Sequence, residues 1–224
     1  MNVCNHHQGQ RPGRPKLQRT RGFTRLEMVV VVAVTALLLA ALILALISAR
    51  RKANLLFCVG RLECVGTAFR IWAGDHHDQY PMAVSVTNGG AMELLARGNV
   101  AACFQVMSNE LSSPGIVLCP GDTRQRAASF GGLGGSNVSY FIDLDATEAV
   151  PQAVLSGDAN LVVNGRALAS GILCLGTNTA AWAKDRHFGE GNVLLCDGSV
   201  MCVWQMGSTN AGGRYAPTNR VVIP

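Results

Sequence analysis

The longest apolar pattern in the chain lies near its N-terminus. The run Met28–Ile47 contains no charged residue and has one weakly polar member, Thr35. Glu27 precedes this run, and the basic cluster Arg50-Arg51-Lys52 follows it. As a helix, a run of this length spans about 30 Å, the thickness of the hydrocarbon core of a bilayer. The pattern therefore predicts a membrane-spanning helix.

The helical period continues beyond this apolar run. Apolar residues recur three and four positions apart, as on one face of a helix, at Leu55, Val59, Leu62, Val65 or Gly66, Phe69 and Trp72. Gly74 is the expected end of the helix, with Pro81 beyond it. We therefore predict a single helix from about Thr24 to Ala73. Its first half would lie in lipid or pack in a helix bundle, and its second half would pack on a sheet.

The remaining residues alternate between short apolar runs and turn signals. Short helices are expected over residues 91–97 and 101–111, and loops over 130–136 and from Gly207 onward. Strands are expected over residues 115–119, 138–143, 153–157, 171–176 and 192–203. The last of these contains Asp197-Gly198 between apolar runs, which is a strong signal for a hairpin. The fold class expected is α+β, with the long N-terminal helix packed on a C-terminal antiparallel β-sheet.

Charge separates the N-terminal 22 residues from the rest of the chain. The whole chain has 19 Lys and Arg against 14 Asp and Glu. Five of the basic residues lie in the N-terminal segment: Arg11, Arg14, Lys16, Arg19 and Arg21. Without that segment 19 − 5 = 14 basic residues face 14 acidic ones, and no basic stripe suited to nucleic acid remains. The positive-inside rule places the basic segment in the cytoplasm and everything after Lys52 in the periplasm.

Cysteine usage fits an exported domain. Seven cysteines follow the N-terminal segment: Cys58, Cys64, Cys103, Cys119, Cys174, Cys196 and Cys202. In an oxidising compartment some of them would pair, although an odd number leaves at least one free or intermolecular. We expect at least one intramolecular disulfide, with Cys119 as a participant. The chain has no C-x-x-C pair, so a zinc ribbon is not expected.

The residues that lead into the apolar run read Gly22-Phe23-Thr24-Arg25-Leu26-Glu27. This segment resembles the N-terminus of type IV prepilins and type II secretion pseudopilins. The resemblance implies that a prepilin peptidase cleaves between Gly22 and Phe23 and that the new N-terminal Phe23 is methylated. It also implies an assembly role for Glu27, at the fifth mature position, as partner of the methylated amine of a neighbouring subunit. Arg25 departs from the pattern, since an apolar residue is usual there. An unprocessed signal anchor is the alternative.

Later segments, taken in order, resemble a subgroup of pseudopilin-like proteins related to the family called DUF1559, found in the Planctomycetes–Verrucomicrobia assemblage. The segments include Cys58-x5-Cys64, Asp75-His76-x-Asp78-x-Tyr80-Pro81, Cys119-Pro120-x-Asp122, Ser139-Tyr140-Phe141, Leu155-Ser156-Gly157-Asp158 and His187-x-x-x-Gly191-Asn192-Val193. The resemblance implies a pilin-like fold. The chain would then consist of a leader over residues 1–22 that is removed, a transmembrane and assembly helix over 23–74, and a periplasmic α+β domain over 75–224.

Two groups of residues carry the types of side chain found in metal or catalytic sites. Asp75-His76-His77-Asp78 offers carboxylates and imidazoles, but a helix-to-loop junction capped by an acid explains it better. His187 lies near Asp185, Glu190 and Asp197 in sequence, and a histidine beside acids can serve as a general base. The hairpin already accounts for Asp197. We therefore expect no catalytic residue, no metal site and no cofactor.

The interpretation favoured by these patterns is a structural, non-enzymatic subunit held in the inner membrane by a single span. Its expected partners are the prepilin peptidase, other pseudopilin subunits and membrane lipid, with no nucleic acid. Two alternatives stay open. One is a membrane-tethered periplasmic module that binds a carbohydrate or protein, and the other is a tethered hydrolase that uses His187.

Overall fold

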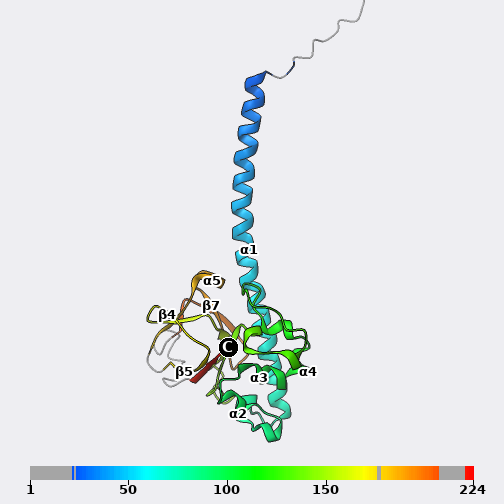
Figure 1. The fold of residues 1–224 in the computed structure, drawn as a ribbon, viewed down its shortest axis with the longest axis vertical. Helices are drawn as coiled ribbons and strands as arrows, with labels where there is room; N and C mark the ends of the chain where they lie inside the picture. The colour runs from blue at the N-terminus through cyan, green and yellow to red at the C-terminus, as the bar shows by residue number, and fades with distance from the viewer. Residues whose placement is uncertain (1–21, 23, 176–177, 207–219) are drawn as a thin grey trace, which may run out of the picture. The chain divides into compact units, whose positions relative to one another are not determined.

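The computed structural model describes residue 22 and residues 24–175, 178–206 and 220–224 (Figure 1). Phe23 and residues 1–21, where the expected leader lies, are outside the described residues. The chain divides into two compact units, Met1–Leu46 and Ile47–Pro224.

Helix α1 (Arg25–Asp75) confirms the prediction of one long N-terminal helix, and it ends one residue beyond Gly74. Its start is stabilised by reciprocal hydrogen bonds, because the Thr24 amide donates to Glu27 Oε2 at 2.7 Å and the Glu27 amide donates to Thr24 Oγ1 at 3.3 Å. This arrangement is a capping box. Within the first unit every described residue is exposed. Among the described residues, α1 is the one helix long and apolar enough to span a membrane.

The part of α1 within the second unit has one buried face. Its buried residues are Cys58, Leu62, Val65, Gly66, Ala68, Phe69, Trp72 and Ala73. Their spacing follows the helical period predicted from the sequence. They belong to one hydrophobic core together with sheet residues that include Tyr140, Ile142 and Leu194. The expectation that this half of the helix packs on a sheet is therefore confirmed.

Short helices follow α1 before the first strand. They are η1 (Pro81–Ala83), η2 (Val86–Asn88), α2 (Met92–Leu95), α3 (Val100–Val106), α4 (Ser108–Leu111), η3 (Pro114–Val117), η4 (Phe130–Gly132) and η5 (Gly135–Asn137). The helices expected over residues 91–97 and 101–111 are confirmed, the second as α3 and α4. The strand expected over residues 115–119 is wrong. That segment forms the 3-10 helix η3, because Pro114 favours a helical start and Ser113 Oγ accepts a hydrogen bond from the Gly115 amide at 3.4 Å.

Two antiparallel sheets complete the second unit. The larger has the strand order β5-β10-β1-β2-β7-β8, and the smaller has the order β4-β3-β6-β9. The strands are β1 (Tyr140–Asp143), β2 (Val154–Asp158), β3 (Leu161–Val163), β4 (Arg166–Ala167), β5 (Gly171–Cys174), β6 (Ala180–Trp182), β7 (Gly191–Leu195), β8 (Val200–Val203), β9 (Gln205–Met206) and β10 (Arg220–Ile223). The expected strands within 138–143, 153–157, 171–176 and 192–203 are confirmed, and β7 and β8 form the predicted hairpin around Gly198, whose φ is +87°.

Side-chain alternation along the larger sheet divides the second unit into two cores. In β1, Tyr140 and Ile142 belong to the core that contains the face of α1, whereas Phe141 between them belongs to the second core. Period-two alternation produces this division, since successive side chains of a strand point to opposite faces. Asp158 pairs in register with Tyr140, so its side chain is on the same face of the sheet as Tyr140.

Candidate functional site

The N-terminal motif is only partly described. Gly22 has no atom beyond its chain neighbours within 4 Å of where a Cβ would lie, and Phe23 is outside the described residues. The Glu27 carboxylate caps its own helix through Thr24. Cleavage between Gly22 and Phe23, methylation of Phe23 and an assembly contact of Glu27 stay predictions.

Residues 75–78 form the helix-to-loop junction that the sequence favoured over a metal site. The His76 ring stacks on Trp72 with its centroid 3.6 Å away, and its Nδ1 lies 2.7 Å from the Trp72 carbonyl oxygen. His77 and Asp78 have φ values of +60° and +56°, which turn the chain out of the helix. These interactions serve the end of α1.

The acids expected around His187 make contacts elsewhere. The Asp185 carboxylate accepts a hydrogen bond from Asn160 Nδ2 at 2.7 Å, and Asp197 Oδ1 accepts one from the Ser199 amide at 2.8 Å. Glu190 Oε2 accepts a hydrogen bond from Cys202 Sγ at 3.4 Å. These side-chain contacts of the three acids are therefore with residues other than His187, and the constellation considered from sequence proximity, which the sequence did not favour, is not formed by these contacts.

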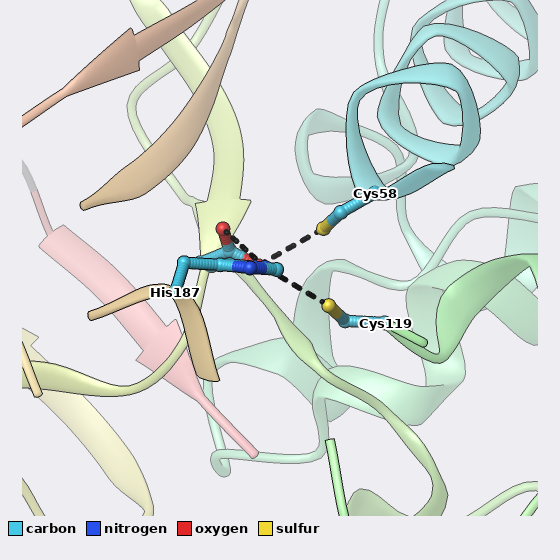
Figure 2. A group of neighbouring side chains, drawn as sticks. Cys58, Cys119 and His187 are labelled. Carbon is cyan, nitrogen blue, oxygen red and sulfur yellow. Dashed lines mark hydrogen bonds and ion pairs between the residues drawn. The ribbon is translucent and has the colours of Figure 1, made fainter. Parts of the chain in front are cut away.

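His187 instead belongs to a buried cluster with Cys58, Cys119 and Asp158, whose potential metal-ligand atoms all lie within 4.8 Å of one another. Figure 2 shows the two sulfurs and the imidazole pointing toward one another from separate parts of the fold. His187 Nε2 is 3.1 Å from Cys119 Sγ and 3.7 Å from Asp158 Oδ2. Cys58 Sγ donates to Asp158 Oδ1 at 3.3 Å.

Four elements place these side chains. Cys58 is on the buried face of α1, one turn before Leu62, and Asp158 is the last residue of β2. Cys119 follows η3 in a loop, and His187 ends α5 (Lys184–His187). The cluster therefore joins the helix, the sheet and two connecting segments, all within the second unit.

A polar network holds the Cys119 loop beside α5. Ser139 Oγ accepts a hydrogen bond from the Cys119 amide at 2.9 Å and donates one to Asp122 Oδ2 at 2.7 Å. Arg186 forms an ion pair with the same Asp122 oxygen at 2.7 Å and donates to the Ser139 carbonyl at 2.9 Å. The side chains of Arg186 and Asp122 are both buried. Because Arg186 immediately precedes His187, this network fixes the position of the imidazole relative to Cys119.

Backbone and side-chain donors surround the acidic members of the cluster. Asp158 Oδ2 accepts hydrogen bonds from the Asn192 amide at 2.8 Å and from Asn192 Nδ2 at 3.1 Å. Cys119 Sγ accepts one from the Gly121 amide at 3.4 Å, and the Tyr140 hydroxyl lies 3.4 Å from Cys58 Sγ. Such donors favour the charged forms of the groups that they contact.

Burial and mutual contacts shift the pKa values of the cluster in opposite directions. The hydrogen bond from Cys58 and the contact with His187 lower the pKa of Cys119 to about 5. The hydrogen bond with Cys119 and burial raise the pKa of Cys58. Burial raises the pKa of Asp158 to about 6. For His187, burial lowers the pKa, but contacts with Cys119 and Asp158 outweigh it and the net direction is upward.

The arrangement differs from a cysteine–histidine–carboxylate catalytic triad. In such a triad the nucleophile and the carboxylate contact different ring nitrogens, so that one orients the ring while the other exchanges a proton. Here Cys119 and Asp158 both face Nε2 of His187. Nδ1 is buried and has no hydrogen-bond partner among the described residues. The four potential ligand atoms instead lie within 4.8 Å of one another, in one group rather than in the sequence that a triad requires.

The expected disulfide is absent from the structure. All seven cysteines of the described residues are free thiols. Cys119 contacts His187, while Cys58 contacts Asp158 and Tyr140. Cys103 is buried among the short helices, and Cys64, Cys174 and Cys202 are exposed. A disulfide bond requires the two sulfurs to be about 2 Å apart. The Cys58 and Cys119 thiols are instead free and hydrogen-bonded to each other.

Comparisons with known protein families, curated proteins and solved structures found no match. The function is therefore inferred from the residues of this chain.

Proposed function

We propose that the chain is a structural pseudopilin-like subunit that assembles through its N-terminal helix into a type II secretion or type IV pilus-like filament. A single span would anchor it in the inner membrane, with the leader in the cytoplasm and the C-terminal domain in the periplasm. Prepilin peptidase would cleave it before assembly. The observation that carries the proposal is the uncharged run Met28–Ile47 on the exposed part of α1, directly after the segment Gly22–Glu27.

The exposed apolar side chains need a partner other than water. Leu37 is 71% exposed and Leu44 is 69% exposed, and large apolar residues around them are exposed as well. Apolar surface of this extent marks a membrane or protein interaction site. Before assembly this surface would contact lipid, and in a filament it would contact the same surface of neighbouring subunits. The His187 geometry does not match a cysteine–histidine–carboxylate triad, because Cys119 and Asp158 both face Nε2.

Glu27 has two roles that experiment can separate. Its carboxylate completes the capping box with Thr24, and in a filament it would pair with the Phe23 amine of a neighbouring subunit. Glutamine also serves at this position of a capping box but carries no charge. Glu27→Gln therefore keeps the helix cap and removes the ion pair. Thr24→Ala does the reverse, since it weakens the cap and keeps the charge.

The test is photo-crosslinking in living cells. A photoreactive residue is introduced at Leu38, within the exposed apolar run, so that the native cysteines stay in place. We expect wild-type and Thr24→Ala chains to give a ladder of crosslinked subunits. Loss of one partner from a buried ion pair costs about 3–5 kcal/mol, so Glu27→Gln should reduce the ladder at least about tenfold. Membrane insertion should be unchanged in both variants.

Equal ladders in the Glu27→Gln and wild-type chains would contradict the assembly role and leave Glu27 as a helix cap. Absence of crosslinked subunits in the wild-type chain would contradict the filament itself. The membrane-tethered periplasmic binding module would then be the better description, since it needs the anchor and no helix–helix assembly.

A further inference from the structure

The distances within the buried cluster match those around a single tetrahedral metal ion. At zinc–ligand bonds of about 2.0–2.3 Å, tetrahedral geometry holds the ligand atoms about 3.3–3.8 Å apart. Cys119 Sγ is 3.1 Å from His187 Nε2, Cys58 Sγ is 3.3 Å from Asp158 Oδ1, and the other oxygen of Asp158, Oδ2, is 3.7 Å from Nε2. One ligand atom from each of the four residues lies within 4.8 Å of the others. The 4.8 Å limit exceeds the tetrahedral spacing by about 1 Å, so the most widely separated ligand atoms would move together by up to about that amount when a metal binds.

The donor set selects the metal. Two sulfurs, one imidazole nitrogen and one carboxylate oxygen are the ligand types that zinc accepts in fourfold sites. Calcium and magnesium require oxygen ligands, so two cysteines argue against both. Zinc also imposes no d-electron preference on geometry, which suits a mixed set of ligands from four separate segments.

The surrounding hydrogen bonds would suit a metal with anionic ligands. The Gly121 amide donates to Cys119 Sγ, and the Tyr140 hydroxyl is placed to donate to Cys58 Sγ once that thiol has lost its proton. Asn192 donates twice to Asp158 Oδ2, while Asp158 Oδ1 accepts the hydrogen bond from Cys58 Sγ. Partners of this kind orient metal ligands and raise metal affinity.

The burial of the four cluster residues also favours a bound cation. The residues Cys58, Cys119 and Asp158 are 0% exposed, and His187 is 5% exposed. Ionised groups buried without adequate pairing are costly, and His187 is the nearest cationic partner of Asp158, at 3.7 Å. A divalent cation at the centre would neutralise two of the three negative charges that the two thiolates and the carboxylate carry.

We propose that Cys58, Cys119, Asp158 and His187 bind one zinc ion in a closed structural site. One Zn²⁺ enters and two protons leave when Asp158 is ionised: one proton comes from the Cys58 thiol, and the other is the proton held between Cys119 and His187. The four protein ligands fill the tetrahedron and leave no position for a substrate, which distinguishes a structural site from a catalytic one.

The zinc ion would fix the second half of α1 to the rest of the exported domain. The site is independent of membrane assembly, because all four ligands belong to the second unit. Cys58 and His187 lie far apart in sequence, so a bond through the metal closes a long loop and restricts the unfolded chain. The proposed ion thus takes the place of the disulfide expected from the cysteine count.

The experiment uses the full chain, extracted in a mild detergent from zinc-supplemented cells and purified without chelator. Elemental analysis measures zinc per chain in the wild type and in Cys58→Ala, Cys119→Ala and Cys103→Ala. Cys103 is the matched control, since it is 0% exposed and is not part of the cluster. We expect about one zinc per chain in the wild type and in Cys103→Ala, and a loss of stoichiometric zinc in the two ligand variants.

Two further measurements do not depend on the folding of ligand variants. The wild-type chain, stripped by a chelator and reloaded with cobalt(II), should show the visible absorption of tetrahedral cobalt and thiolate-to-cobalt charge transfer. Tyr140→Phe keeps all four ligands and removes one outer hydrogen bond, so its zinc affinity should fall by about 10- to 100-fold.

Three results would overturn the proposal. One is a wild-type chain with free thiols that neither contains zinc nor gives the cobalt spectrum. Another is a Cys58–Cys119 disulfide, found by peptide mapping of the freshly isolated, non-reduced protein. The third is full zinc content in both ligand variants, which would place the metal elsewhere.

Discussion

A substitution of Gly191 by alanine tests the packing beside the buried cluster. Gly191 is a buried residue at the start of β7, and the indole ring of Trp182 lies directly over it. A Cβ at this position would be 2.0 Å from Trp182 Cε2 and 2.2 Å from both Cδ2 and Nε1. Ordinary contact between carbon atoms requires about 3.5 Å, so the ring would have to move by about 1.5 Å.

The free-energy cost follows from what that movement breaks. Trp182 is 4% exposed, and its Nε1 donates a hydrogen bond to the Asp158 carbonyl oxygen at 3.0 Å. Forcing extra volume into a packed core costs about 1–3 kcal/mol, and a lost internal hydrogen bond adds about 0.5–1.5 kcal/mol. We therefore expect Gly191→Ala to lower the free energy of unfolding by about 2–4 kcal/mol.

The assay is denaturant unfolding of the full chain in detergent, followed by tryptophan fluorescence and circular dichroism. Gly60→Ala is the matched control, because Gly60 lies within α1 and no atom outside the adjoining helix backbone is within 4 Å of where its Cβ would lie. Alanine in a helix interior is more stable than glycine by about 0.5–1 kcal/mol. The same chemical change should thus destabilise the protein at one position and stabilise it at the other. Equal effects, or a Gly191→Ala chain as stable as the wild type, would refute the close contact with Trp182.

Two further stability predictions use the same assay. Phe69→Ala should lower the free energy of unfolding by about 3–5 kcal/mol, because Phe69 is 0% exposed in the core. Ile71→Ala on the same helix should lower it far less, because Ile71 is 51% exposed. Similar losses in the two variants would show that α1 packs with another face. Arg186→Ala should lower the free energy of unfolding by about 3 kcal/mol, because it breaks a buried ion pair with Asp122. The expected loss is at the lower end of the range for buried pairs because Arg124 remains 3.7 Å from the same Asp122 oxygen. A loss below about 1 kcal/mol would show that the pair is not buried in solution.

Local patterns sufficed to predict the elements that carry strong periodicity. The apolar run and the three-and-four spacing after it predicted α1 to within two residues at each end. The hairpin at Asp197-Gly198 was also predictable, because Gly198 supplies the positive φ that the turn requires. Short strands were harder. Strand β10 has only four residues, follows a glycine-rich tail, and gains its stability from pairing with β1 and β5.

The buried cluster was not predictable because its members share no local spacing. The nearest sequence signal is that Cys58 falls on the same helix face as Leu62 and Phe69, which marks it as buried. Strand register then places Asp158 opposite Tyr140 on the side of the sheet that shares a core with α1. His187 was singled out from the sequence, but with acids that were neighbours only along the chain. Tertiary pairing decided its true partners.

The central claim, that this chain is processed and anchored as a pseudopilin-like subunit, is tested most directly at its N-terminus. The measurement is the intact mass, together with N-terminal sequencing, of protein extracted from membranes. The account predicts a chain of residues 23–224 that begins with a methylated Phe23, and a chain that keeps its leader when Gly22→Leu obstructs cleavage. Wild-type protein that retains Met1, or that is trimmed after Ile47, would contradict it.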